Sequence, residues 1–192
     1  KNAEGGHDWF HIERVYNNAK LIAENECNCN LEVVKLGALL HDIADSKFHD
    51  GNEDIGPDIA LKHLNSLEVR EDIKNHVINI IRNISFRKSK EKLEFDSLEL
   101  RVLQDADRLD AIGAIGIARA FNYGGFKNRE FYNPEVPPIT EMTADQYKKS
   151  TSPTINHFYE KLLLLKDMMH TRTGQTMAKK RHEFMEEYLQ NF

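Results

Sequence analysis

Apolar residues recur at helical spacing along almost the whole chain, and this periodicity constrains the fold more than any other feature of the sequence. In segment 9–24, one helical face would carry Ile12, Val15, Tyr16, Ala19, Ile22 and Ala23. Segment 31–41 is apolar nearly all round, which is typical of a central, buried helix. No segment shows convincing strand alternation or an internal repeat. The sequence therefore predicts an all-α fold with non-bundle connectivity.

We expect seven or eight helices in a single domain over residues 1–192, a length sufficient to bury a core. The expected helices span 9–24, 31–41, 56–67, 69–84, 97–112, 113–121, 153–169 and 174–190. Asp96 is a candidate cap for the fifth of them. Segment 122–152 is irregular and contains three prolines, so it is a candidate lid over a site.

Charge and composition exclude several classes of protein. The chain has 26 Lys and Arg against 31 Asp and Glu, a formal net charge of -5, so no nucleic-acid partner is expected. No run approaches the 18 apolar residues of a membrane span, and no secretion signal is recognisable, so we expect a cytoplasmic protein without a membrane partner. The spacing of Cys27 and Cys29 suits neither a disulfide framework nor a four-cysteine zinc site, which indicates surface thiols.

The pair His41-Asp42 directly follows the most apolar predicted helix. Burying two such groups without partners would cost roughly 1–3 kcal/mol for each, and more for a charge. A divalent cation would remove that cost, because neutral imidazole and carboxylate are both metal ligands. The alternative is that His41 caps the helix C-terminus and Asp42 forms an ordinary ion pair.

A second polar cluster lies within the helix expected over 97–112. It places Asp105, Asp107 and Asp110 between apolar residues, although Asp is a poor former of helix interiors. Asp107 and Asp110 share a face, whereas Asp105 points elsewhere. A carboxylate on the core side needs a cation there, either Arg or a metal ion.

A third cluster lies near the start of the chain. His7 and His11 are four residues apart, the spacing of a two-histidine metal site on one helical face. His7 follows Gly5-Gly6 and falls before the expected helix, so His11 is the better candidate ligand.

The ordered set His11, His41-Asp42 and Asp107 resembles the H…HD…D signature of the HD superfamily of metal-dependent phosphohydrolases. The resemblance extends to the surrounding segments His7–Val15, Ala38–Asp50, Gln104–Arg119, Phe158–Leu162 and Ala178–Arg181, which are similar to the small bacterial single-domain branch of that superfamily. It implies an HD-type helical fold and one divalent cation held by the four residues of the signature. Manganese is the favoured ion, with Mg²⁺, Ni²⁺, Fe²⁺ or Zn²⁺ as alternatives.

The same resemblance implies an activity. Members of this branch hydrolyse phosphate bonds of nucleotides, and Asp45 occupies the position where related nucleotidases have an acidic residue that acts on the attacking water. HD families with two metal ions take further histidines from the middle helices. The corresponding helix end here reads Ile84-Ser85, so the sequence favours one metal ion.

The hypothesis that follows is a nucleoside triphosphate pyrophosphohydrolase that uses a metal-activated water. Arg14 and Lys47 are candidates to neutralise phosphoryl charge, and His49 is a candidate to protonate the leaving oxygen; each has the alternative of a surface ion pair. The other six histidines receive no special role, and we expect His170 and His182 to be solvated.

Other readings of the same residues stay open at this point. The substrate could instead be a nucleoside monophosphate, a cyclic nucleotide or a guanosine tetraphosphate alarmone. A metal- or nucleotide-sensing module and a helical interaction protein are the non-enzymatic alternatives. The expected partner is a small nucleotide, and a homodimer is an open option.

Overall fold

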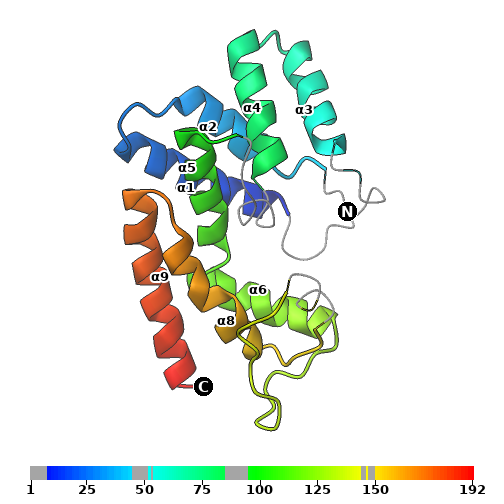
Figure 1. Ribbon diagram of the computed structural model, residues 1–192, viewed down its shortest axis with the longest axis vertical. Coiled ribbons are helices and arrows are strands. Elements are labelled where there is room, and N and C mark those ends of the chain that lie inside the picture. Colours follow the sequence, from blue (N-terminus) through cyan, green and yellow to red (C-terminus); the bar gives the residue numbers. More distant parts are fainter. Residues whose placement is uncertain (1–7, 45–51, 53, 85–94, 144–145, 147–149) are drawn as a thin grey trace. The chain divides into compact units, whose positions relative to one another are not determined.

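The computed structural model describes residues 8–44, 52, 54–84, 95–143, 146 and 150–192, and these residues contain helices but no strand (Figure 1). The all-α prediction is therefore confirmed. The helices of the described residues are α1 (Trp9–Asn25), α2 (Leu31–Leu40), α3 (Ile55–Ser66), α4 (Glu71–Asn83), α5 (Leu98–Asp110), α6 (Gly113–Phe126), α8 (Asn156–Glu160), the 3-10 helix η3 (Leu162–Met168) and α9 (Arg172–Gln190). Within the described part of the chain, no helix is long and apolar enough to cross a membrane.

The chain divides into two compact units, Trp9–Asp107 and a second that contains Arg108–Phe192. The first unit, called the N-terminal unit, holds α1 to α4 and α5 as far as Asp107. The second, called the C-terminal unit, holds α6, α8, η3 and α9. That the whole chain acts as one domain stays a prediction.

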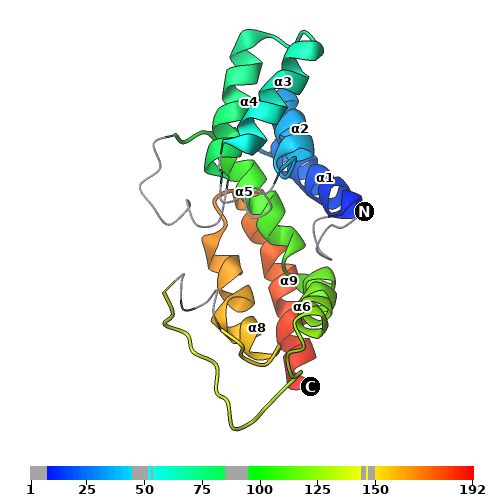
Figure 2. The same ribbon diagram turned by 90° about the vertical axis from the view of Figure 1, so that its right-hand side faces the viewer.

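In the N-terminal unit, α2 packs against α1 and α4, and α3 packs beside α4 (Figures 1 and 2). An ideal Cβ on Gly37 of α2 would lie 2.5 Å from Leu103 Cδ1, so the missing side chain lets α2 and the Leu103 side chain approach closely. The apolar core of this unit is fully buried and includes Val15, Ala19, Ile22, Val34, Ala38, Val77, Ile80, Leu100, Leu103 and Ala106.

Polar contacts fix the start of α5 within this core. Ser97 Oγ accepts a hydrogen bond from Leu100 N at 3.1 Å, which caps the helix. Glu99 is buried, and its Oε1 accepts from Asn30 N at 2.8 Å, at the start of α2. His76 Nε2 on α4 lies 3.0 Å from Ser97 Oγ and 3.4 Å from Glu99 Oε2. The first turn of α5 is therefore tied to both α2 and α4.

Asp96 does not cap α5, so that prediction is wrong. Its carboxylate instead pairs with the guanidinium of Arg101, whose Nε donates to Oδ1 at 2.9 Å. The cap moves one residue along the chain to Ser97, because a hydroxyl there is within reach of the free N–H groups of the first turn.

The single helix expected over 153–169 is also wrong. α8 ends at Glu160, Lys161 has φ -146° and ψ -56°, and the chain continues as the 3-10 helix η3. Leu162 and Leu165 are both buried, and residues three apart fall on one face of a 3-10 helix. An apolar pattern at this spacing fits both kinds of helix, so the sequence pattern alone did not separate them.

In the C-terminal unit, α9 packs against α6 and η3. The Phe121 ring of α6 lies at the centre of an aromatic cluster, with ring centroids at 5.2 Å from Phe131, 6.1 Å from Phe158, 6.3 Å from Tyr188 and 6.4 Å from Phe192. Aromatic pairs at such separations stabilise the packing beyond their buried area. The cluster joins α6, α8 and the end of α9 to the segment that follows α6.

Two glycines of α6 offer a matched test of this packing. An ideal Cβ on Gly116 would lie 2.3 Å from the backbone oxygen of Ala111, whereas a Cβ on Gly125 would meet nothing within 4 Å. Because backbone cannot rotate away, we expect Gly116→Ala to lower the free energy of unfolding by about 1–3 kcal/mol. Gly125→Ala is expected to raise it by up to about 1 kcal/mol, since alanine restricts the unfolded chain. Urea unfolding of the two variants measures both effects, and equal changes of the same sign would contradict this packing.

Candidate metal centre

Two imidazole rings and two carboxylates come together in the N-terminal unit. His11 lies on α1 and His41 at the C-cap of α2, and their side chains are only 1% and 3% exposed. Asp42 Oδ2 lies 3.5 Å from His11 Nε2 and 3.6 Å from His41 Nε2. Asp107 Oδ1 of α5 lies 3.6 Å from His11 Nε2. All four residues that carry the H…HD…D resemblance are therefore brought together.

The local structure of each helix explains why these four side chains lie at the centre. His11 is one turn before the fully buried Val15, so both face the core from α1. α2 ends at Leu40, which leaves His41 on its last, buried turn and Asp42 just beyond it. Asp107 follows the buried Leu103 by one turn on α5, whose first turn is fixed as described above.

The orientation of the His41 ring is fixed by the backbone of its own helix. Nδ1 lies 2.8 Å from the carbonyl oxygen of Ala38, and a carbonyl can only accept, so Nδ1 carries the proton. Nε2 is buried and makes no hydrogen bond. In its neutral form the ring thus presents a lone pair toward Asp42, the arrangement in which a metal-binding imidazole is held by its other nitrogen.

The distances between these donors are too long for good hydrogen bonds and suit the sharing of a cation. Atoms of His11, His41 and Asp107 all lie within 4.8 Å of one another and could hold a metal ion. The two carboxylates are the more exposed members, at 27% for Asp42 and 45% for Asp107. The centre is therefore closed by imidazole on its inner side and bordered by carboxylate on its accessible side.

The acidic run of α5 is divided between different partners. Asp110 is fully buried in the C-terminal unit, where Arg119 Nη1 donates to its Oδ2 at 2.7 Å and to its carbonyl oxygen at 3.1 Å. Asp105 is also fully buried. The sequence left open whether Arg or a metal ion would compensate these carboxylates. Arg119 compensates Asp110, and Asp107 faces the histidines.

The other predicted site residues have different outcomes. Arg14 lies on α1 one turn after His11, as expected. Asp45, Lys47 and His49 lie outside the described residues, as does His7. His182 is buried rather than solvated, since it is only 9% exposed and its Nε2 lies 3.3 Å from Glu186 Oε1. His170 is exposed, as expected.

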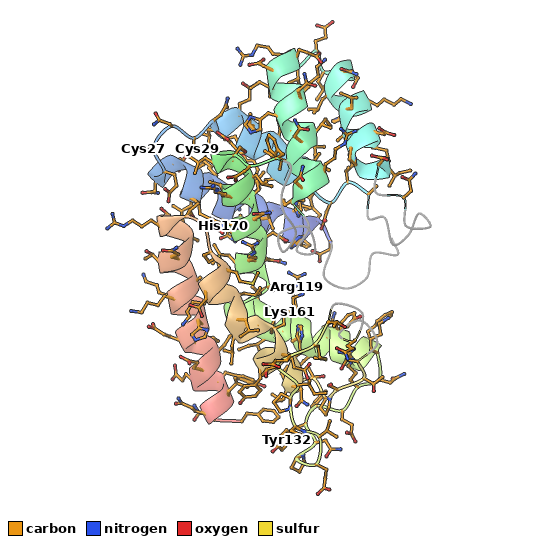
Figure 3. All side chains as sticks on the ribbon, viewed as in Figure 1. Cys27, Cys29, Arg119, Tyr132, Lys161 and His170 are labelled. Carbon is orange, nitrogen blue, oxygen red and sulfur yellow. The ribbon has the colours of Figure 1, made fainter. Side chains whose placement is uncertain are left out.

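Cys27 and Cys29 lie in the turn between α1 and α2 (Figure 3). Cys27 is exposed, whereas Cys29 is half-buried. Burial, followed by the negative charges of Glu99 and Glu26, raises the pKa of Cys29 to about 11. Because the thiolate is the form that binds metal, Cys29 is a poor ligand at neutral pH.

Comparison with known families identifies the fold around this centre. The family model of the HD domain matches residues 9–112, which include all four residues of the donor cluster. The chain belongs to the HD family. The match covers the N-terminal unit and the end of α5, so this family's sequence pattern coincides with the part of the chain that builds the centre.

Relatives of this HD-family chain extend over nearly its whole length. The protein YpgQ of Bacillus subtilis, described as uncharacterized, is 38% identical over 185 residues, which are 96% of this chain and 82% of YpgQ. The crystal structure of an HD-superfamily hydrolase from Bacillus thuringiensis has a TM-score of 0.78 and 41% identity, over 100% of this chain and 86% of that one. The crystal structure of YpgQ in complex with ADP has a TM-score of 0.76 and 38% identity, over 97% of this chain and 87% of that one.

Sequence analysis missed two contacts that shape the centre. One is the bond from His41 to Ala38, for which the only signal was the position of His41 at a helix end. The other is the contact of buried Glu99 with Asn30, which joins residues far apart in the chain and left no local signal.

Binding of a divalent cation is expected to stabilise the protein through this centre. At an Mn²⁺ concentration of about one hundred times Kd, the gain is about 2.7 kcal/mol, or roughly 5–10 °C in Tm. His41→Ala should remove the increase, and His63→Ala, which changes an exposed histidine of α3, should retain it. Thermal unfolding in Mn²⁺ and in EDTA measures the increase; an undiminished shift in the His41→Ala protein would contradict this centre.

Proposed function

We propose that this HD-family chain hydrolyses phosphate bonds of nucleotides and acts as a nucleoside triphosphate pyrophosphohydrolase. The observation that carries the proposal is the cluster of His11, His41, Asp42 and Asp107, with the Nδ1 of His41 held by Ala38. The similarity to YpgQ, which was crystallised in complex with ADP, supports a nucleotide as the substrate.

In this proposal the four residues hold one divalent cation. Two imidazoles and two carboxylates form a mixed nitrogen and oxygen donor set that suits Mn²⁺, with Fe²⁺, Ni²⁺, Zn²⁺ or Mg²⁺ as alternatives. When bound, such an ion polarises a phosphoryl oxygen and lowers the pKa of a bound water. The single group of candidate donors found in the described residues supports one ion rather than two.

In the same proposal, side chains of the protein balance charge, bind the substrate phosphate and move protons. Asp42 and Asp107 balance the charge of the ion, and their exposed edges leave room for a substrate phosphate. Arg14 lies on α1 one turn after His11, and we retain for it the proposed role of attracting phosphoryl oxygens. For Asp45, Lys47 and His49 we retain the proposed roles of orienting the water, binding phosphate and protonating the leaving oxygen.

Hydrolysis assays with nucleotides and Mn²⁺ test the proposal directly. We expect nucleoside triphosphates to give the monophosphate and pyrophosphate, because the attack is proposed at the α-phosphorus. His41→Ala and Asp42→Ala should each lower the rate roughly a thousandfold or more, since the ion supplies several kcal/mol of transition-state stabilisation. His63→Ala is the matched control and should keep the wild-type rate.

Chromatography of the products separates the alternatives. Release of orthophosphate from a monophosphate, opening of a cyclic nucleotide or hydrolysis of an alarmone, without cleavage of triphosphates, would replace the proposed substrate by one of these. Wild-type rates in the His41→Ala protein with metal present would contradict the mechanism itself. Nucleotide binding without any turnover would indicate a sensing module.

A further inference from the structure

A cavity of about 530 Å³ lies within the C-terminal unit. Its walls come from residues 132–138, which begin at the Tyr132 labelled in Figure 3, from α8, and from the end of α9 with Phe192 beyond it. Among the described residues that line it, none carries a charge and none is a donor of the metal centre. Cavities of roughly 300–1,000 Å³ with mainly apolar walls and a few polar groups are typical sites for small molecules. The composition of this cavity favours an uncharged ligand.

Hydrogen bonds hold the wall formed by residues 132–138 against α8. Before this wall, Ile155 N at the start of α8 donates to the carbonyl oxygen of Phe131 at 3.0 Å. After it, Ile139 N donates to Glu160 Oε1 at the end of α8 at 3.2 Å. Three prolines between these two points restrict the backbone further. Because the wall is fixed before a ligand arrives, little conformational entropy is lost when one binds.

Asn156 places a buried carboxamide in the wall of the cavity, since the residue is only 2% exposed. Its Nδ2 donates to the carbonyl oxygen of Val136 at 2.8 Å. A carbonyl can only accept, so this bond fixes the orientation of the carboxamide and turns Oδ1 away from Val136. Oδ1 accepts no hydrogen bond from any residue that the structure describes. An acceptor of a buried side chain is costly without a partner, and an N–H group of a ligand would satisfy it.

Aromatic rings form another part of the cavity wall. Tyr132 and Phe192 are each 54% exposed, and their ring centroids are 5.8 Å apart with an angle of 82° between the ring planes. Tyr159 of α8 also lines the cavity and is 40% exposed. Exposed apolar side chains that gather at one place are typical of binding sites. The face of an aromatic ring favours contact with another planar ring.

We propose that the cavity lined by Tyr132, Asn156 and Tyr159 binds an uncharged, planar heteroaromatic ring that carries an N–H donor. The ring packs against the aromatic wall, and its N–H donates to Asn156 Oδ1. An unphosphorylated nucleobase or nucleoside has this chemistry, because the amino group of adenine lies at the edge of a planar ring. A phosphate group does not fit, since no described lining residue supplies a cation for it. The site does not rest on the proposed hydrolytic function.

Titration calorimetry of the full chain with adenosine in EDTA tests the site. We expect saturable binding to one site per chain with a Kd on the order of 0.1 mM. Binding should weaken roughly tenfold in Tyr132→Ala, which removes the ring, and should be kept in Tyr132→Phe. Phe184→Ala is the matched control, because Phe184 is a 49% exposed aromatic residue of α9 that is not among the lining residues. His41→Ala should bind adenosine as the wild type does, so loss of hydrolysis and loss of this site are separate results.

A change in the ligand tests the role of Asn156 without altering the protein. N6,N6-dimethyladenosine has no N–H on its amino group, so we expect it to bind roughly tenfold more weakly than adenosine. Nuclear Overhauser effects between adenosine and the ring protons of Tyr132 locate the bound molecule.

Several results would overturn the proposal. They are the absence of saturable adenosine binding, equal affinity for the dimethylated analogue, unchanged binding in a folded Tyr132→Ala protein, and loss of binding in His41→Ala. A dimer that dissociates in Tyr132→Ala, in a protein that does not bind adenosine, would overturn it in favour of a second copy of the chain.

Discussion

The burial of two histidine side chains beside two carboxylates is the constraint on which the N-terminal unit depends. The His11 and His41 side chains are almost fully enclosed by the apolar core, yet both Nε2 atoms face Asp42 at 3.5–3.6 Å. Such a group of polar atoms is costly inside a protein unless something compensates it. A divalent cation would meet that need, and the packing of α1, α2 and α5 brings the donors together.

Contacts at the start of α5 determine where Asp107 lies, although α5 is distant in the sequence from α1 and α2. The Ser97 cap and the Glu99 contacts with Asn30 and His76 tie its first turn to α2 and α4. Asp107 is more than two turns further along the same helix, so its position depends on these anchors. Metal binding at this centre would therefore be coupled to stability, because unfolding of α5 would separate Asp107 from the histidines.

Much of the fold could be predicted from the sequence, because apolar spacing alone identifies most helices of an all-α protein. The break at Lys161 could not, since buried Leu162 and Leu165 satisfy both α and 3-10 periodicities. The four donors were proposed from their resemblance to a family signature, and the structure brings them together. The compensation of Asp110 by Arg119 depends on a contact between separate helices, which local sequence patterns do not reveal.

The central claim is that these four side chains hold one divalent cation. Anomalous X-ray diffraction from crystals of the protein grown with Mn²⁺ tests it most directly. The account predicts one strong anomalous peak per chain, bonded to His11 Nε2, His41 Nε2 and carboxylate oxygens of Asp42 and Asp107. A peak that lacks either histidine, or Mn²⁺ bound only elsewhere on the chain, would contradict it.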